Sequence, residues 1–247
     1  MQRLDLSMVQ VVLFHYHGLK DMHLWSALPW TAAAIHICAE RQTKWWFAKR
    51  FLTPAVASRY RLVAIWDEDL GVEESFDFAR YVDIVTTHGL EISQPAVIGP
   101  VSWPITMRVP GIELHKHSKY KSNSELCTPE DMHVPPCGAM VEVQAPVFTT
   151  AAWQCVWLLL QNDLVHAFGI DMAWHVCATA DGKGSSSDAA EHMGIVDATP
   201  VEHLRVPSLA AQGVADGKEP PWVSINQRRD LEWAVFNARW EARGRGS

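Results

Sequence analysis

The sequence predicts a single α/β domain whose mostly parallel central sheet is flanked by helices. Two observations predict this class. Short apolar runs rich in β-branched and aromatic residues alternate with segments that have helical periodicity. The chain has 247 residues, 48% of them hydrophobic, which is enough for one large core, and we find no internal repeat. Because strands that alternate with helices form crossover units, we expect the strands to run parallel.

The first half of the chain is expected to alternate between strands and helices. In order, these are a strand at 9–14, a helix at 43–51, a strand at 61–66, a helix at 77–87 and a short strand at 90–93. Asp77 has the side chain of an N-cap, and Gly89 lies just past the end of the same helix. Pro95 is expected to close the short strand.

The second half begins with a long irregular segment, 96–137, which is rich in Pro, Gly, His, Lys and Ser. A loop of this length inside a compact domain is usually functional or disordered. Order then returns as a strand, a helix, a short helical segment and a strand end, at 139–143, 149–161, 169–176 and 194–197.

The chain is expected to divide into three parts. The α/β domain spans 1–204, a linker rich in Pro and Gly follows at 205–221, and 222–247 holds a C-terminal amphipathic helix that packs on the domain. The residues of this helix that we predict to face inward are Leu231, Val235 and Ala238.

Composition limits the classes of partner. The net charge is −7 and the pI is about 5.9, so nothing here attracts nucleic acid or an anionic membrane surface. No stretch reaches the roughly 18 to 20 continuous apolar residues that a membrane span needs, and the N-terminus lacks a signal-peptide layout. The twelve Trp residues lie mainly in apolar segments. They belong either to the core or to an aromatic floor for a sugar or a base.

Five cysteines are present, and none of them forms a C-x-x-C pair. A zinc ribbon or a thioredoxin motif is therefore not indicated. Cys127 and Cys137 bracket a Pro-rich loop, a spacing that suits a disulfide in an oxidising compartment, and Cys155 and Cys177 lie on adjacent predicted helices. The alternative is five buried thiols.

An acidic turn follows the predicted strand at 61–66. Asp67 and Asp69 come directly after Trp66 and are two residues apart, so in an extended segment their side chains leave the same face. In open α/β folds, ligands bind just outside the carboxyl ends of strands. Two carboxylates about 4 Å apart repel by roughly 4 kcal/mol at an effective dielectric of about 20, and a bound Mg²⁺ or Mn²⁺ turns this repulsion into attraction. The alternative is a solvated acidic turn.

Two further polar residues are candidates for a site. Asp171 lies just after Gly169, near the start of a short helical segment. Its carboxylate is either an N-cap or a general base that takes a proton from a hydroxyl. His203 follows the strand end at 194–197 and is either structural or a metal ligand. Imidazole suits transition metals better than magnesium, so binding together with Asp67 and Asp69 would favour Mn²⁺.

Several longer blocks of the chain resemble one known family, the plant and algal domain-of-unknown-function 707 family. The similarity covers nearly the whole chain, from about Val11 to Trp240. This family in turn resembles, more distantly, the GT-A class of nucleotide-sugar glycosyltransferases, which implies a single GT-A-like, Rossmann-like domain. The blocks that carry the resemblance are 42–52, 66–72, 89–96, 145–148, 161–166 and 194–197.

The resemblance implies a metal site and a donor site. Asp67 and Asp69 match the D-x-D position that holds the metal and the diphosphate of the sugar nucleotide, with Trp66 beside them. His203 falls where such enzymes often have a C-terminal metal-binding histidine. The implied cofactor is Mn²⁺ or Mg²⁺.

The resemblance also implies catalytic residues. Asp171 matches the acidic position after the Gly-rich turn that acts as the base in inverting members. Glu142, at the end of its predicted strand, is a second candidate for contact with the acceptor.

The sequence also departs from the family pattern. Relatives have an upstream strand, before Val9, that contributes to the nucleotide-base pocket, and an N-terminal membrane anchor that places them in the Golgi. Neither is recognisable here, so we expect the N-terminal strand of the fold to be missing, and a Golgi or other secretory location follows from the resemblance alone. Some relatives bear a name that links them to lysine–ketoglutarate reductase, but no G-x-G-x-x-G follows a strand here to support a nicotinamide enzyme.

The sequence therefore predicts a metal-dependent glycosyltransferase. It would move a hexose or pentose from a nucleotide-sugar donor to a glycan or another hydroxyl acceptor. The alternative is a catalytically inactive GT-A-like module that binds a glycan or a partner through its Trp-rich surface.

Overall fold

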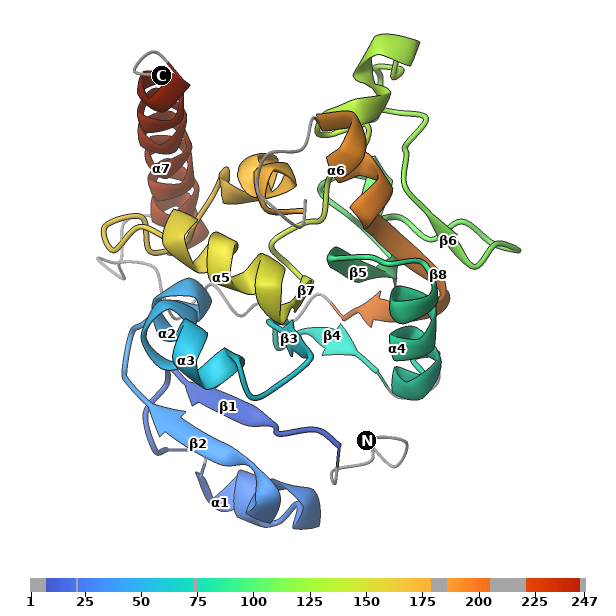
Figure 1. Ribbon diagram of the computed structural model, residues 1–247. Coiled ribbons are helices and arrows are strands. Elements are labelled where there is room, and N and C mark those ends of the chain that lie inside the picture. The colour runs from blue at the N-terminus through green and yellow to red at the C-terminus, as the bar shows by residue number, and fades with distance from the viewer. Residues whose placement is uncertain (1–7, 21, 73–74, 179–185, 205–220, 245–247) are drawn as a thin grey trace.

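The computed structural model describes residues 8–20, 22–72, 75–178, 186–204 and 221–244. Its centre is a six-stranded sheet with the strand order β3-β7-β5-β8-β4, in which β6 also pairs with β8 (Figure 1). The strands of this sheet are β3 (Leu62–Ala64), β4 (Leu70–Gly71), β5 (Ile92–Ile98), β6 (Leu114–His115), β7 (Val147–Thr149) and β8 (Met193–His203).

The sheet is mixed, so the expectation of a mostly parallel sheet is wrong. Only β5 and β8 pair in parallel within it, while β7 is antiparallel to both β3 and β5, and β4 and β6 are antiparallel to β8. A parallel neighbour requires a crossover connection, usually an α-helix. The connection from β5 to β7 contains no α-helix, and it enters β7 at the edge of the sheet where β5 ends, so β7 runs antiparallel to β5.

The strand directions bring several chain segments to one edge of the sheet. Because β7 is antiparallel to both β3 and β5, these two strands share a direction, and β8 follows β5. The carboxyl ends of β3, β5 and β8 therefore lie at one edge. The residues that lead into the reversed strand β7 reach the same edge. Polar side chains at these four places are thus expected to converge.

Helices cover both faces of the sheet. α4 (Phe78–Thr87) lies on one face, and α5 (Thr150–Leu159) lies on the other (Figure 1). Neighbouring residues of β8 alternate between the two cores, since Ile195 packs in the cluster that contains Trp153 of α5, and Val196 packs in the cluster that contains Ile84 of α4. Burial on both faces is what a sheet between two helical layers requires.

The helices α4 and α5 begin where the sequence predicts. The Asp77 side chain accepts a hydrogen bond from the backbone N–H of Arg80, and the Thr149 side chain accepts one from Ala152. Both are N-caps, which satisfy backbone donors that have no partner inside the helix. The predicted helix starts are therefore confirmed.

The remaining helices complete the layer of α5 and the periphery. The 3-10 helix η4 (Ile170–Cys177) and the C-terminal α7 (Pro221–Gly244) extend the layer of α5, and Phe236 of α7 is buried in its core. α6 (Ser186–His192) leads directly into β8. The other short 3-10 helices are η1 (Pro29–Ala33), η2 (Pro104–Thr106) and η3 (Pro129–His133).

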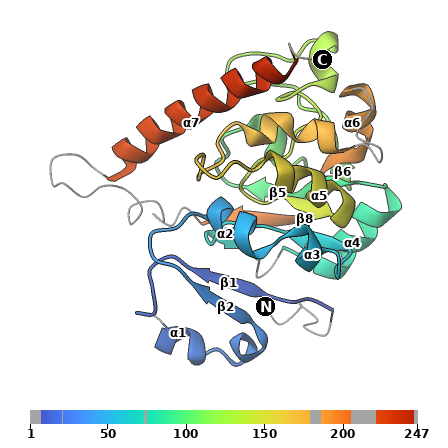
Figure 2. The same cartoon turned by 60° about the vertical axis from the view of Figure 1, so that its left-hand side comes forward.

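The N-terminal part of the chain forms a second, two-stranded sheet. β1 (Val12–His15) and β2 (Ile35–Cys38) pair in parallel, which confirms the strand expected at 9–14. Figures 1 and 2 show this sheet with α1 (Met22–Ser26) on one side and α2 (Lys44–Phe51) on the other. Phe14 stacks on Phe47 of α2 at 4.7 Å between ring centroids. α3 (Pro54–Ala57) follows α2.

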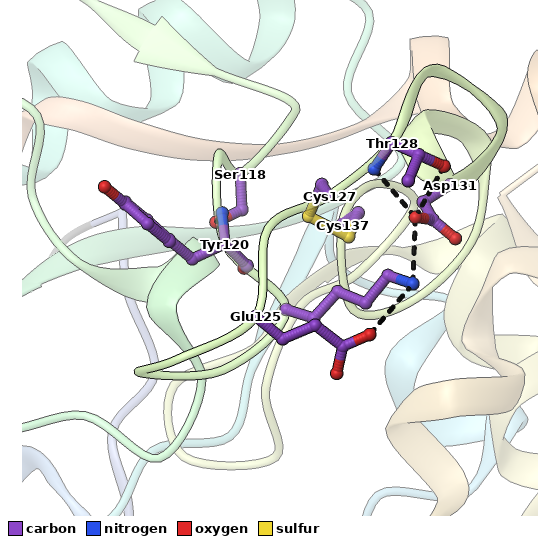
Figure 3. The surroundings of a disulfide bond; sticks show 8 residues. Ser118, Tyr120, Glu125, Cys127, Thr128, Asp131 and Cys137 are labelled. Carbon is purple, nitrogen blue, oxygen red and sulfur yellow. Dashed lines mark hydrogen bonds and ion pairs between the residues drawn. A yellow bond between two sulfur atoms is a disulfide. The ribbon is translucent and has the colours of Figure 1, made fainter.

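Two disulfides link the chain, as one of the two interpretations of the cysteines predicts. Cys127–Cys137 closes the long loop around η3, where Lys121 pairs with Asp131 at 2.9 Å (Figure 3). Cys155–Cys177 joins α5 to the last residue of η4. Cys38, at the end of β2, is exposed and has a free thiol.

Three expectations about single elements are wrong. β5 runs through Pro95 to Ile98, because β7 pairs only with Ile92 and Ser93 and so needs no backbone hydrogen bond from Pro95. Residues 139–143 form no strand, although 139–142 are buried, and the strand is β7 instead. Among the described side chains of α7, Glu232 and Phe236 are buried and Val235 packs against the core as expected, while Leu231 and Ala238 are exposed. The predicted linker at 205–221 lies outside the described residues except for its last residue.

Candidate functional site

A pocket of about 420 Å³ lies at the sheet edge where β3, β5 and β8 end. This volume falls within the range of roughly 300–1,000 Å³ that is usual for small-molecule sites. One wall is apolar and comes from β1 and α2, where Val12, Phe14 and Phe47 line it. The opposite wall is polar and comes from the turn after β3, the segment before β7 and the end of β8.

Asp67 lines this pocket but is already paired with a cation. The Lys44 ammonium lies 2.5 Å from its carboxylate and also donates to the backbone carbonyl of Val143, at 2.5 Å. Burial raises the pKa of Asp67, and the nearby Lys44 opposes this rise only in part. Lys44 is the first residue of α2, where the helix dipole disfavours a cation. That unfavourable placement is the sequence signal for Lys44, which our sequence analysis missed.

Asp69 and His203 meet at the rim of the pocket, as the sequence predicts. Their closest atoms, Oδ2 of Asp69 and Nε2 of His203, are 3.1 Å apart. The short β4–β8 pairing brings them together, since Leu70 is the partner of His203 and the N–H of Leu204 donates to the carbonyl of Asp69. The predicted D-x-D pair is therefore divided: Asp69 faces His203 and Asp67 faces Lys44.

The second nitrogen of His203 decides what this contact means. Nδ1 lies 2.8 Å from the backbone carbonyl of Pro100, which can only accept, so Nδ1 carries a proton. In a neutral imidazole Nε2 then has a lone pair, which faces the carboxylate oxygen of Asp69. A proton shared between these two atoms, or a metal ion bound to both, satisfies the contact.

Oδ2 of Asp69 and Nε2 of His203 are spaced like two ligands of a small divalent ion. Octahedral ligands at about 2.1 Å from such an ion lie about 3.0 Å from their neighbours, close to the 3.1 Å between these two atoms. Within the described ranges, no group of three or more His, Cys, Asp or Glu side chains is arranged to hold a metal. The protein would thus supply two direct ligands, with Asp67 held nearby by Lys44.

Glu142 is the most unusual acid of the pocket. It is 7% exposed, and its Oε2 has no hydrogen-bond partner in the described structure. Burial and then the charge of Asp171 raise its pKa to about 7. A carboxyl group with such a pKa can exchange a proton near neutral pH.

Asp171 lies behind Glu142 and does not line the pocket. It is 4% exposed, and burial raises its pKa to about 6 although its Oδ1 accepts a hydrogen bond from the backbone N–H of Met172. The residue that precedes η4 is Gly169, so Asp171 is not the N-cap of this helix. Its role as a base stays a prediction.

Trp66 and Glu68 also line the pocket. The indole Nε1 of Trp66 is buried without a partner in the described structure, and its ring packs edge-on against Phe76, at 5.0 Å between centroids. The hydroxyl of Tyr16 donates to Glu68 and so ties the end of β1 to the acidic turn.

Comparison with known proteins places the chain in a family. The family model described as "Protein of unknown function (DUF707)" matches residues 1–245. The chain belongs to the DUF707 family. No curated protein and no solved structure gives a significant match to it.

Among the helices of the described residues, none combines the length and the apolar character that a membrane crossing requires.

Proposed function

We propose that this DUF707 chain is a metal-dependent glycosyltransferase with a GT-A-like fold. It would transfer a sugar from a nucleotide-sugar donor to a hydroxyl acceptor. The observation that carries the proposal is the contact of Asp69 with His203, two side chains that can both bind a metal and whose facing atoms are 3.1 Å apart. The contact lies at the rim of a pocket large enough for a small-molecule donor.

Asp69 and His203 would hold Mn²⁺ or Mg²⁺ in this proposal. When bound, the ion supplies charge neutralisation for the leaving diphosphate. Lys44 of α2 adds an ammonium group to the lining of the pocket, held there by Asp67 and by the carbonyl of Val143. The mixture of an imidazole with carboxylates favours Mn²⁺ over Mg²⁺.

The remaining pocket residues divide between donor and acceptor. The apolar wall of Phe14 and Phe47 offers a surface for a planar base, and Trp66 lies beside the diphosphate position. Glu142 would accept the proton of the acceptor hydroxyl once it is ionised, since its pKa is raised to about 7. Asp171 then acts through Glu142, because its negative charge helps to raise that pKa.

Two disulfides support a location in an oxidising compartment. Structural disulfides persist mainly in secreted, luminal and extracellular proteins, and this chain has two of them. They agree with the Golgi or secretory location that the family resemblance implies.

Thermal unfolding with Mn²⁺ and a panel of nucleoside diphosphates tests the proposal. We expect the melting temperature to rise clearly only when metal and nucleotide are both present. Asp69→Asn and His203→Gln should abolish the rise. Asp83→Asn removes an exposed carboxylate on α4, away from the pocket, and is the matched control that should keep it.

The same experiment distinguishes the alternative, a non-catalytic GT-A-like module. The Lys44–Asp67 ion pair favours this alternative, because it neutralises one of the two D-x-D carboxylates without a metal. Such a module would show no combined effect of metal and nucleotide. That result with the unsubstituted chain would refute the transferase proposal.

A further inference from the structure

A buried carboxylate from the C-terminal helix holds a histidine of the pocket wall. Glu232 of α7 is 1% exposed. Its Oε2 accepts a hydrogen bond from the backbone N–H of His166, at 3.0 Å, and its Oε1 lies 3.1 Å from Nδ1 of the same residue. Arg228 donates to Oε1 from the preceding helical turn, at 2.9 Å. Burial raises the pKa of Glu232, but the hydrogen bonds from His166 and Arg228 outweigh it and leave this pKa below its usual value.

These contacts fix the proton of His166. An ionised carboxylate only accepts hydrogen bonds, so Nδ1 of the imidazole must carry the proton. In the neutral form of this imidazole, Nε2 then presents a lone pair. Over the described residues, nothing donates a hydrogen bond to this nitrogen. His166 and the neighbouring Phe168 line the pocket, with ring centroids 5.8 Å apart.

A structural role accounts for Nδ1 of the imidazole, which donates to Glu232, but not for Nε2. Two other contacts already attach α7 to the same loop: Arg228 donates to the backbone carbonyl of Asp163 at 2.9 Å, and Arg239 pairs with its carboxylate at 2.7 Å. Glu232 also receives the backbone N–H of residue 166, which any residue except proline could provide. The free acceptor on the pocket side is what a histidine adds here.

We infer that His166 is a specificity-determining residue, whose Nε2 accepts a hydrogen bond from a hydroxyl of the bound sugar. The inference rests on the proposed function, because it concerns the same pocket. Sugars are rich in hydroxyl donors, and Phe168 provides an adjoining apolar ring for their C–H faces. An acceptor that a bound ligand covers selects for such a donor, since a ligand without one leaves the nitrogen unpaired.

The first test measures the tautomer of the His166 imidazole and its chemical reactivity. Long-range ¹H–¹⁵N spectra of the full chain should identify His166 as the Nδ1–H tautomer, and Glu232→Gln should abolish that single tautomer. Diethyl pyrocarbonate, which modifies unprotonated imidazole nitrogen, should label His166 at least ten-fold faster than His115. The two side chains are similarly exposed, at 15% and 11%, but both nitrogens of His115 are engaged, by Asp197 and by the carbonyl of Ile105. Equal labelling, or a proton on Nε2, would overturn the inference.

The second test asks which sugar reaches His166. Labelling is repeated with Mn²⁺ plus UDP-glucose, UDP-xylose or GDP-mannose, with Mn²⁺ plus bare UDP or GDP, and with free glucose, galactose or xylose. The exposed His133, in the disulfide loop, is the internal reference. Slower labelling with nucleotide sugars alone assigns the hydroxyl to the donor, and slower labelling with free sugars assigns it to the acceptor.

The two proposals fail in different ways. If Mn²⁺ with bare UDP or GDP raises the melting temperature but no sugar slows the labelling of His166, the inference is overturned and the proposed function stands. If free sugars slow the labelling while metal and nucleotide have no thermal effect, the inference stands and the transferase proposal is refuted.

Discussion

At the scale of single residues, the pocket keeps an acid that costs stability. Glu142 is buried, its Oε2 has no partner in the described structure, and its pKa is raised to about 7 by burial and by Asp171. A raised pKa means that the fold favours the protonated form. The folded state is therefore not penalised below the ordinary pKa of a glutamate, where Glu142 is protonated whether the chain is folded or unfolded. The free energy of unfolding falls as the pH rises through about 7.

Glu142→Gln should consequently stabilise the protein at high pH. Because glutamine cannot ionise, we expect the free energy of unfolding to rise by about 1–3 kcal/mol at pH 8 and to change little at pH 4. Urea unfolding at the two pH values measures this difference. Glu202→Gln, at an exposed site on β8, is the control that should have little effect at either pH. Equal stabilisation at both pH values would contradict the assigned cause.

The residues of the site were predictable in part. Asp69 and His203 were expected to lie together, and the two-residue pairing of β4 with β8 brings them into contact. The partner of Asp67 was not predictable from the D-x-D spacing, because Lys44 comes from a helix that is distant in sequence. His166 was likewise missed, since its role depends on a carboxylate 66 residues further along the chain.

At the scale of elements, the disulfide between α5 and η4 lies inside the larger core. Cys177 is buried there, and Cys155 packs against the same cluster as Trp153 and Trp174. Its two cysteines are 22 residues apart. Closing a loop of this size removes entropy from the unfolded chain that corresponds to roughly 3 kcal/mol.

Replacing both cysteines by alanine should therefore lower the melting temperature by roughly 6–12 °C, at 2–4 °C per kcal/mol for a chain of this size. Differential scanning calorimetry measures this change. Cys38→Ser is the matched control, because Cys38 is exposed and takes part in no disulfide. If the control falls as far as the double variant, the loss does not come from the disulfide.

The helices were more predictable than the strands, for a physical reason. α2, α4 and α5 each have an N-cap side chain and a local periodicity that the sequence displays directly. β4 and β6 have two residues each, which is too short for any alternation to register. Their positions depend on pairing with β8, a long-range contact that no local pattern encodes.

At the scale of the whole molecule, the pocket joins distant parts of the chain. Its walls come from β1, the turn after β3, the segment before β7 and the loop that α7 holds. Because β7 runs in the reverse direction, the segment before it lies at the rim where β3 and β8 end. A ligand that fills the pocket must therefore contact several segments at once.

Amide hydrogen exchange tests this arrangement. Mn²⁺ with a stabilising nucleoside diphosphate should slow exchange together in 12–16, 66–69 and 164–168, because one ligand restrains all three walls. The loop at 119–137, which contains the Cys127–Cys137 disulfide, has no residue in the pocket and should exchange as before. Protection confined to a single segment would mean that the walls do not share a ligand.

The free thiol of Cys38 has a practical consequence. Cys38 pairs with His15 in the β1–β2 sheet, and His15 directly precedes Tyr16 of the pocket wall. The other four cysteines are oxidised, so a maleimide fluorophore should attach at this position without any engineered cysteine. Its emission would then report on the N-terminal wall as compounds are added, which offers a format for screening ligands of the pocket.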